Sequence, residues 1–201
     1  MKLGNFSEKL HKRPSLKDVV EGPPPLPPLP IFKGITDYKP TPNVSRGREI
    51  IPEGIVLHHT GGSYSGAVAW CLNPRSQVSY HVIVNLDGKR TILASDNQRA
   101  WHSGVSSFKG KSGCNNFMLG ISVSGDTNHR ELTKEEIESV ALLCVDKMKL
   151  WGFGLDDITT HKEVSPGRKN DVDIRAEESI KRQIKKYIHE HDWRKKSEDN
   201  V

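Results

Sequence analysis

The stretch that decides the fold is Gly54–Gly62, with the sequence GIVLHHTGG. Its apolar start predicts a buried strand, and its closing glycines predict a turn directly afterwards. His58 and His59 stand at the tip of that strand, where a side chain is well placed to join a site. Because side chains alternate along a strand, the two histidines are expected to point to opposite faces.

Elements of both kinds are predicted on the C-terminal side of this strand. A short helix is expected over 65–72, and further strands over 78–85, 90–94 and 118–125, with a hairpin turn at 86–89. Residues 98–117 read as one long loop, and such loops are often functional. Strands that alternate with helices and include a hairpin predict an α/β (mixed) fold, with a central mixed β-sheet flanked by helices.

Two longer helices complete the predicted domain. Thr133 and Glu136 have the spacing of a capping box, and the helix that they begin carries a core-facing apolar stripe up to Trp151. Gly152 is expected to end it. A last helix is predicted over 174–188.

The chain is expected to hold one domain with an extension at each end. The domain is assigned to residues 46–189, the arm before it to 1–45 and a charged tail to 190–201. Within the arm, residues 23–30 read PPPLPPLP, which predicts an extended polyproline segment because proline lacks the N–H that helices and sheets need. The segment is either a stiff spacer or a ligand for an aromatic groove on an unknown partner.

Composition narrows the function classes. The 201 residues carry a formal net charge of +5, which favours an anionic partner such as nucleic acid or bacterial wall polymer. The basic residues are not interleaved with aromatic ones, so no nucleic-acid partner is expected. No apolar run is long enough for membrane insertion, and the start MKLGNFSE does not resemble a secretory signal, so we expect synthesis in the cytoplasm.

Cysteine usage indicates no disulfide framework. The three cysteines, Cys71, Cys114 and Cys144, cannot all pair, and reduced thiols are the default for a cytoplasmic product. A hydrolase with a cysteine nucleophile and a histidine base stays an alternative, although no cysteine has a recognisable activating context.

The segment 159–173, TTHKEVSPGRKNDVD, holds a possible metal pair. His161 and Asp171 can share one ion only if the chain folds back between them, and Pro166-Gly167 has the turn chemistry for this. An imidazole and a carboxylate are ligand types that zinc accepts, and a third protein ligand would leave one position for water.

Four blocks of the sequence together resemble a known family. They are residues 55–60, 78–83, 100–104 with 114–117, and 161–171, in this order. With these blocks the chain resembles the type 2 N-acetylmuramoyl-L-alanine amidases, a family that includes phage endolysins, wall-recycling amidases and peptidoglycan recognition proteins. The resemblance covers roughly residues 50–185.

The resemblance implies a Zn²⁺ cofactor and a set of roles. His58, His161 and Asp171 match the metal ligands, Lys169 matches a lysine that stabilises the developing oxyanion, and Tyr80 matches a tyrosine beside the metal-bound water. The implied substrate is peptidoglycan, cut at the amide between the lactyl group of N-acetylmuramic acid and L-alanine.

The central strand departs from part of the family. Ser122 and Ser124 stand where many recycling-type members carry glutamate, so a carboxylate base is missing from that strand and the proton acceptor stays open. The chain therefore looks closer to phage endolysins, which would act on the host wall after release. A cytoplasmic muropeptide-recycling amidase and a non-catalytic peptidoglycan-binding module are the alternatives.

Other residues receive less certain roles. We expect Trp101 and His102 to line the groove and touch substrate, because they lie in the long loop. Arg168 either binds a substrate carboxylate or faces solvent. His59 reads as a neighbour of the ligand His58, and His81 as either a satisfied core histidine or a site residue.

Overall fold

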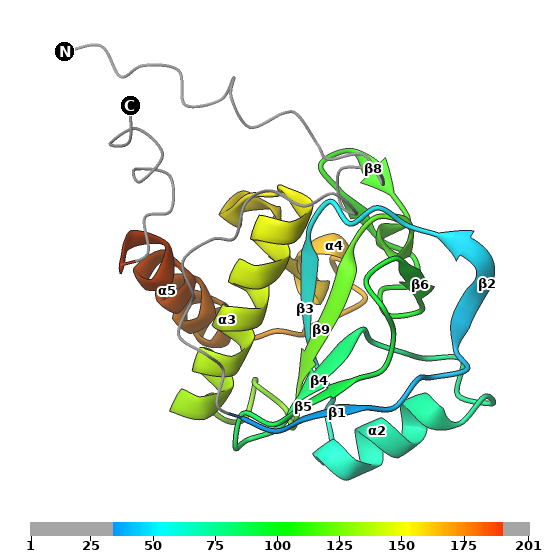
Figure 1. Ribbon diagram of the computed structural model, residues 1–201, viewed down its shortest axis with the longest axis horizontal. Coiled ribbons are helices and arrows are strands. Elements are labelled where there is room, and N and C mark those ends of the chain that lie inside the picture. The colour runs from blue at the N-terminus through cyan, green and yellow to red at the C-terminus, as the bar shows by residue number, and fades with distance from the viewer. Residues whose placement is uncertain (1–33, 191–201) are drawn as a thin grey trace, which may run out of the picture.

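The computed structural model describes residues 34–190. Its central sheet has six strands in the order β1-β5-β4-β9-β3-β10 (Figure 1). Only β4 and β5 pair antiparallel within it, and the other pairs are parallel. The mixed sheet expected from the sequence is confirmed. The strands are β1 Thr36–Tyr38, β3 Ile55–His59, β4 Val82–Val84, β5 Arg90–Ile92, β9 Leu119–Val123 and β10 Ile158–Thr160.

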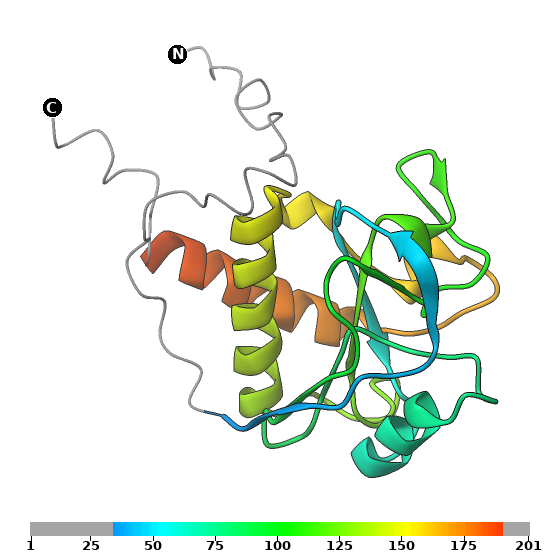
Figure 2. The ribbon, with the colours of Figure 1, turned by 45° about the vertical axis from the view of Figure 1, so that its right-hand side comes forward.

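Helices flank the sheet. The long helices α3 (Lys134–Trp151) and α5 (Ile174–Glu190) pack against each other on one side, as Figures 1 and 2 both show. The other elements are α2 (Tyr64–Leu72), α4 (His161–Val164), and the 3₁₀ turns η1 (Cys114–Asn116) and η2 (Leu155–Asp157). Two short ribbons complete the fold: β2 (Val44–Glu49) with β6 (Gln98–Ala100), and β7 (Ser107–Phe108) with β8 (Lys111–Ser112).

The alternation of β3 divides the core into two faces. Ile55 and Leu57 belong to the large apolar cluster that α3 and α5 cover. Val56 points the other way and packs with Met118 and Val164. By the same alternation His58 lies on the face of Val56, away from the two long helices, and this is the face on which the candidate site forms.

Helix α3 begins and ends as the sequence predicts. The Thr133 hydroxyl accepts a hydrogen bond from Glu136 N at 3.1 Å, and the Glu136 carboxylate accepts one from Thr133 N at 3.0 Å. Gly152 closes the helix with a positive φ of 75°. Cys144 is fully buried in the main core, as expected for a packing residue.

The structure differs from the sequence-based prediction in several segments, and it includes the strands β2 and β10, which were not expected. Residues 78–81 are not part of a strand, and β4 begins only at Val82. The expected loop 98–117 contains β6, β7, β8 and η1. The sheet also takes in β1, which lies within the segment assigned to the arm. These elements were missed because they are two to six residues long and have no apolar periodicity.

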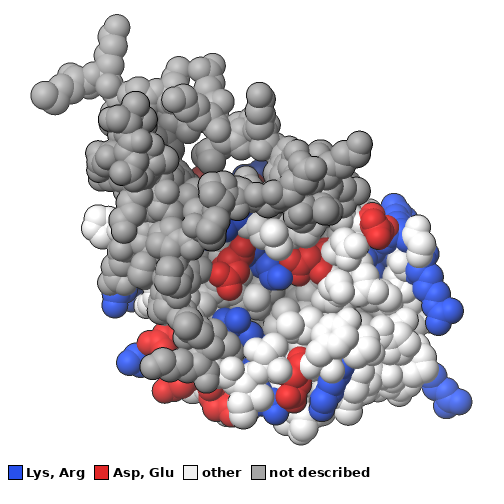
Figure 3. All heavy atoms as spheres, in the orientation of Figure 1, with Lys and Arg blue, Asp and Glu red and all other residues white. Residues whose placement is uncertain are grey.

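The ends of the chain are outside the description. The polyproline segment 23–30 and the tail from residue 191 lie outside the described residues. Within 34–190, no helix is both long and apolar enough to cross a membrane. On the face drawn in Figure 3, basic and acidic side chains are scattered among uncharged ones.

Candidate metal centre

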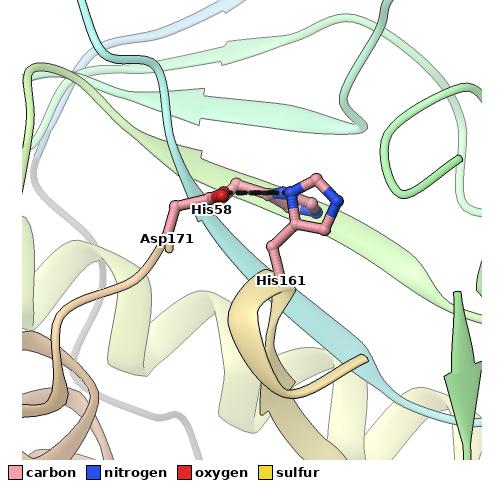
Figure 4. A group of neighbouring side chains, drawn as sticks. All are labelled: His58, His161 and Asp171. Carbon is pink, nitrogen blue, oxygen red and sulfur yellow. Dashed lines mark hydrogen bonds and ion pairs between the residues drawn. The ribbon is translucent and has the colours of Figure 1, made fainter. Parts of the chain in front are cut away.

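Three potential metal ligands converge on one point. His58 comes from the end of β3, His161 is the first residue of α4, and Asp171 lies in the segment before α5 (Figure 4). The Nδ1 atoms of His58 and His161 lie 3.3 and 3.1 Å from the same oxygen, Asp171 Oδ2. The three ligand atoms are all within 4.8 Å of one another, and all three residues are buried.

The chain folds back between His161 and Asp171 in the predicted way. Gly167 has φ 75°, and the N–H groups of Arg168 and Lys169 both bond the Ser165 carbonyl. Lys162 N then donates to the Asp171 carbonyl at 2.5 Å, which closes the loop at its base. The turn residues thus bring a histidine and a carboxylate ten positions apart onto one site.

Hydrogen bonds on the far side of each ring fix the tautomers of the two histidines. His161 Nε2 lies 3.2 Å from the Ser103 carbonyl, which can only accept, so Nε2 carries the proton and Nδ1 is bare. His102 Nε2 must likewise donate to the Met118 carbonyl at 3.1 Å. Its Nδ1 then accepts from His58 Nε2 at 3.0 Å, which leaves His58 Nδ1 bare as well.

Two bare nitrogens therefore face one carboxylate oxygen. Burial lowers the pKa of His58 to about 4, so no proton lies between its Nδ1 and Asp171 at neutral pH. The pKa of Asp171 lies well below its usual range although burial raises it, so the carboxylate is ionised. Converging lone pairs with this charge need a cation between them.

The donor set fits zinc. Two imidazole nitrogens and one carboxylate oxygen form a ligand combination typical of catalytic zinc sites, in which a fourth position is left for water or substrate. Hydrogen bonds from the outer ring nitrogens to a carbonyl and to a histidine are the second-shell support that such sites require. The residues expected from the resemblance to be ligands are thus the ones that the fold brings together.

His102 is almost fully buried, and its ring contacts the ligand histidine His58 through a hydrogen bond. Its ring packs closely on β9, where a Cβ at Gly120 would come within 2.5 Å of His102 Cγ. The Asn115 side chain accepts hydrogen bonds from His102 N and Ser103 N and holds this backbone in place. Asn115 belongs to one of the sequence blocks and Gly120 to the predicted strand 118–125, but nothing local in either segment indicated these roles.

We expect His102→Ala to weaken zinc affinity by about 10- to 100-fold, because His58 loses the acceptor that orients its ring. Chelator competition measures this. His81→Ala is the matched control, because His81 is equally buried but its ring nitrogens bond Gln98 O and Gly120 N, and no ligand. Equal affinity in His102→Ala and wild type would contradict the orienting role.

Tyr80 lies beside the metal site, with its ring tilted relative to that of His58. Its ring centroid lies 5.1 Å from that of His58, and its hydroxyl bonds the Ser122 side chain. Burial and the charge of Asp171 raise the pKa of Tyr80, so the phenol keeps its proton at neutral pH. Ser122 is paired with His58 in the β3–β9 register and is fully buried. The hydroxyl of Tyr80 is thus suited to donate a hydrogen bond rather than to act as a base.

Arg168 connects the loops around the site. Its Nη2 donates to the carbonyls of Ser103 and Val105 at 2.5 and 2.8 Å, and to Ser165 Oγ at 2.7 Å. Ser103 O is also the acceptor for His161, so the guanidinium holds the carbonyl that fixes a ligand tautomer. Arg168 is also exposed and lines the cleft, so both roles weighed from the sequence, binding a substrate carboxylate and facing solvent, stay predictions.

An open cleft of about 670 Å³ lies over the metal site. Trp101 is half-buried there, with its indole N–H bonded to Ser45 Oγ at 3.0 Å. Lys169 is exposed and also lines the cleft. Further lining residues are His59, Thr60, Gly61, Gly62, Gly66, Ala67, Trp70, Tyr80, Arg168 and Asp171.

The remaining candidates have other surroundings. His59 accepts a hydrogen bond from Thr127 N through Nδ1 and takes no part in the ligand cluster. His81 is a core histidine with both nitrogens bonded. Cys71 also lines the cleft, but burial raises its thiol pKa to about 11, so it is not an activated nucleophile.

The domain has a mixed α/β fold, and its buried His-His-Asp cluster lies beneath an open cleft. This combination is typical of metal-dependent hydrolases. The model of one family, N-acetylmuramoyl-L-alanine amidase, matches residues 47–173. The chain belongs to this family, and the resemblance seen in its sequence blocks is confirmed.

Individual relatives support the same assignment. The 1,6-anhydro-N-acetylmuramyl-L-alanine amidase AmpD of Haemophilus influenzae is 36% identical over 96 residues, which are 47% of this chain and 52% of that protein. The amidase AmiD of Escherichia coli is 24% identical over 132 residues, 58% of this chain and 47% of that protein. The matches thus span about half the length of these relatives.

Solved structures show the same fold. A crystal structure of a selenomethionine AmpD derivative superposes with a TM-score of 0.62 at 22% identity, covering 74% of this chain and 93% of that one. A mutant endolysin from Bacillus subtilis superposes with a TM-score of 0.59 at 19% identity, covering 75% and 99%. AmpD and an endolysin thus both share this architecture.

Proposed function

We propose that the protein is a zinc-dependent N-acetylmuramoyl-L-alanine amidase that hydrolyses the bond between the lactyl group of N-acetylmuramic acid and L-alanine. The observation that carries the proposal is the convergence of two bare imidazole nitrogens and an ionised carboxylate beneath an open cleft. Family membership supports the same reaction. The binding-module alternative is less favourable because all three ligands and Lys169 are present.

Each site residue has a defined task in this proposal. His58, His161 and Asp171 would hold zinc, which when bound activates water and polarises an amide carbonyl. Lys169 lines the cleft from the loop that also carries Asp171, so its ammonium can stabilise negative charge that develops on the carbonyl oxygen. Tyr80 keeps its proton and positions the attacking water through its hydroxyl.

The proposal also concerns the biological role of the amidase, which decides whether its substrate is wall polymer or a soluble muropeptide. Serines at 122 and 124 favour a phage-type endolysin acting on wall polymer, since the strand lacks the carboxylates expected of recycling-type members. Sequence similarity to AmpD favours soluble anhydro-muropeptides as the substrate. We propose the endolysin role, with recycling as the second candidate.

A digestion with and without chelator tests the reaction and the setting together. We expect release of stem peptides with a free L-alanine amino group from purified sacculi, loss of release with chelator, and recovery with added Zn²⁺. Faster cleavage of soluble anhydro-muropeptides than of sacculi would favour the recycling role. If the protein bound zinc but cleaved neither substrate, the result would favour a non-catalytic peptidoglycan-binding module.

A further inference from the structure

Helix α2 forms one wall of the cleft, and the residues of this wall take no part in the metal site. Gly66, Ala67 and Trp70 line the cleft at helical spacing, so one side of α2 runs along it. Trp70 is 56% exposed there. An exposed indole that lines an open cleft offers an apolar ring face, with a polar N–H at its edge, to a ligand in that cleft.

Trp70 differs from the other described tryptophans in how it is held. The indole N–H of Trp101 donates to Ser45, and that of Trp151 donates to Asp96 at 2.8 Å. Within residues 34–190 the Trp70 indole has no hydrogen-bond partner, and only Val68 and Cys71 of its helix are buried. Packing and hydrogen bonding inside the domain therefore do not account for Trp70.

Glycines also line this part of the cleft. A Cβ at Gly61 or Gly62 would meet no atom within 4 Å, and at Gly66 it would meet only the Ser63 hydroxyl, at 3.0 Å. The turn after β3 and the first part of α2 thus line the cleft with small residues, and Trp70 is the large side chain among them.

The Lys, Arg, Asp and Glu residues of the cleft all come from one segment, which is not α2. Among the described lining residues the Lys, Arg, Asp and Glu members are Arg168, Lys169 and Asp171, all from the α4–α5 connection. The α2 wall contributes none. A muramoyl-peptide has the same division, because the stem peptide carries carboxylates whereas the glycan consists of neutral sugar rings.

We propose that the α2 wall is the glycan subsite of this amidase, in which Trp70 stacks on the face of a sugar ring. The C–H face of a hexose is apolar and matches an indole, while its hydroxyls stay in water. The inference rests on the proposed function and places the peptide along the Lys169 wall. It makes Trp70 a specificity-determining residue for substrates that carry glycan.

Binding of neutral strands of N-acetylglucosamine tests this without any bond cleavage, because these strands lack the lactyl carboxylates that a basic protein could bind by charge alone. We expect wild-type protein to bind such strands, Trp70→Ala to bind about tenfold more weakly, and Trp70→Phe to keep most of the affinity. Leu150→Ala is the control, because Leu150 is an exposed apolar residue of α3 that does not line the cleft. Titration calorimetry gives the affinities.

Hydrolysis of sacculi supplies a second readout. Trp70→Ala should raise KM by about tenfold and leave kcat and zinc content near wild type. Equal glycan affinity in wild type and Trp70→Ala overturns the inference, as does a loss of affinity for free stem peptide instead of glycan. Failure of the amidase reaction leaves the glycan measurement interpretable, and failure of glycan binding leaves the amidase reaction standing, so the two are distinguishable.

Discussion

Asp171→Ala is expected to abolish both zinc binding and hydrolysis. Asp171 Oδ2 is the atom on which both bare Nδ1 atoms converge, and it supplies the only negative charge among the three ligands. Without it two neutral imidazoles remain, which is fewer than the three protein ligands of a catalytic zinc site. Zinc content should fall from about one per chain to near zero, and sacculus hydrolysis by at least about 1,000-fold.

Asp173→Asn is the matched control for this variant. Asp173 lies two positions further along the same segment, but its carboxylate bonds Arg175 and no ligand. Asparagine keeps an oxygen for the Arg175 N–H, so the start of α5 is preserved. Zinc content, release of L-alanine-terminated peptides and the circular dichroism spectrum are the measurements. A folded Asp171→Ala protein that kept its zinc would show that the third ligand is another group.

Local signals were sufficient to predict much of the scaffold. The run 54–62 predicted β3 because three apolar residues before a glycine turn are a strong strand signal. The Thr133–Glu136 capping box predicted the start of α3, because both of its hydrogen bonds lie within one helical turn. The Pro166-Gly167 turn predicted the approach of His161 and Asp171, because a turn is also set by residues that are neighbours in sequence.

Long-range contacts set the limit of that prediction. β1 and β10 are three residues long, and they become strands only through pairing with β5 and β3. His102 was predicted to line the groove, and it is one of the residues around the cleft, but its contact with His58 was not predicted. Its position behind His58 depends on Gly120 and Asn115, which approach only in the folded chain. No spacing rule carries that information.

Lys169→Met is expected to lower kcat by about 100- to 1,000-fold while zinc content stays at the wild-type level. Lys169 extends from the turn between His161 and Asp171 into the cleft, where its ammonium can face the oxygen of the scissile amide. Methionine keeps much of the aliphatic length and removes the charge. Because the charge matters most when the oxyanion forms, kcat should fall far more than affinity for the substrate.

Two further variants separate this role from a general effect of positive charge. Lys162→Met removes an exposed lysine that does not line the metal cleft, so its kcat should stay near wild type. Lys169→Arg keeps the charge on a different geometry and should recover only part of the rate. If Lys169→Met instead raised KM with kcat unchanged, the lysine would bind the ground state, and stabilisation of the oxyanion would have to come from the metal and Tyr80.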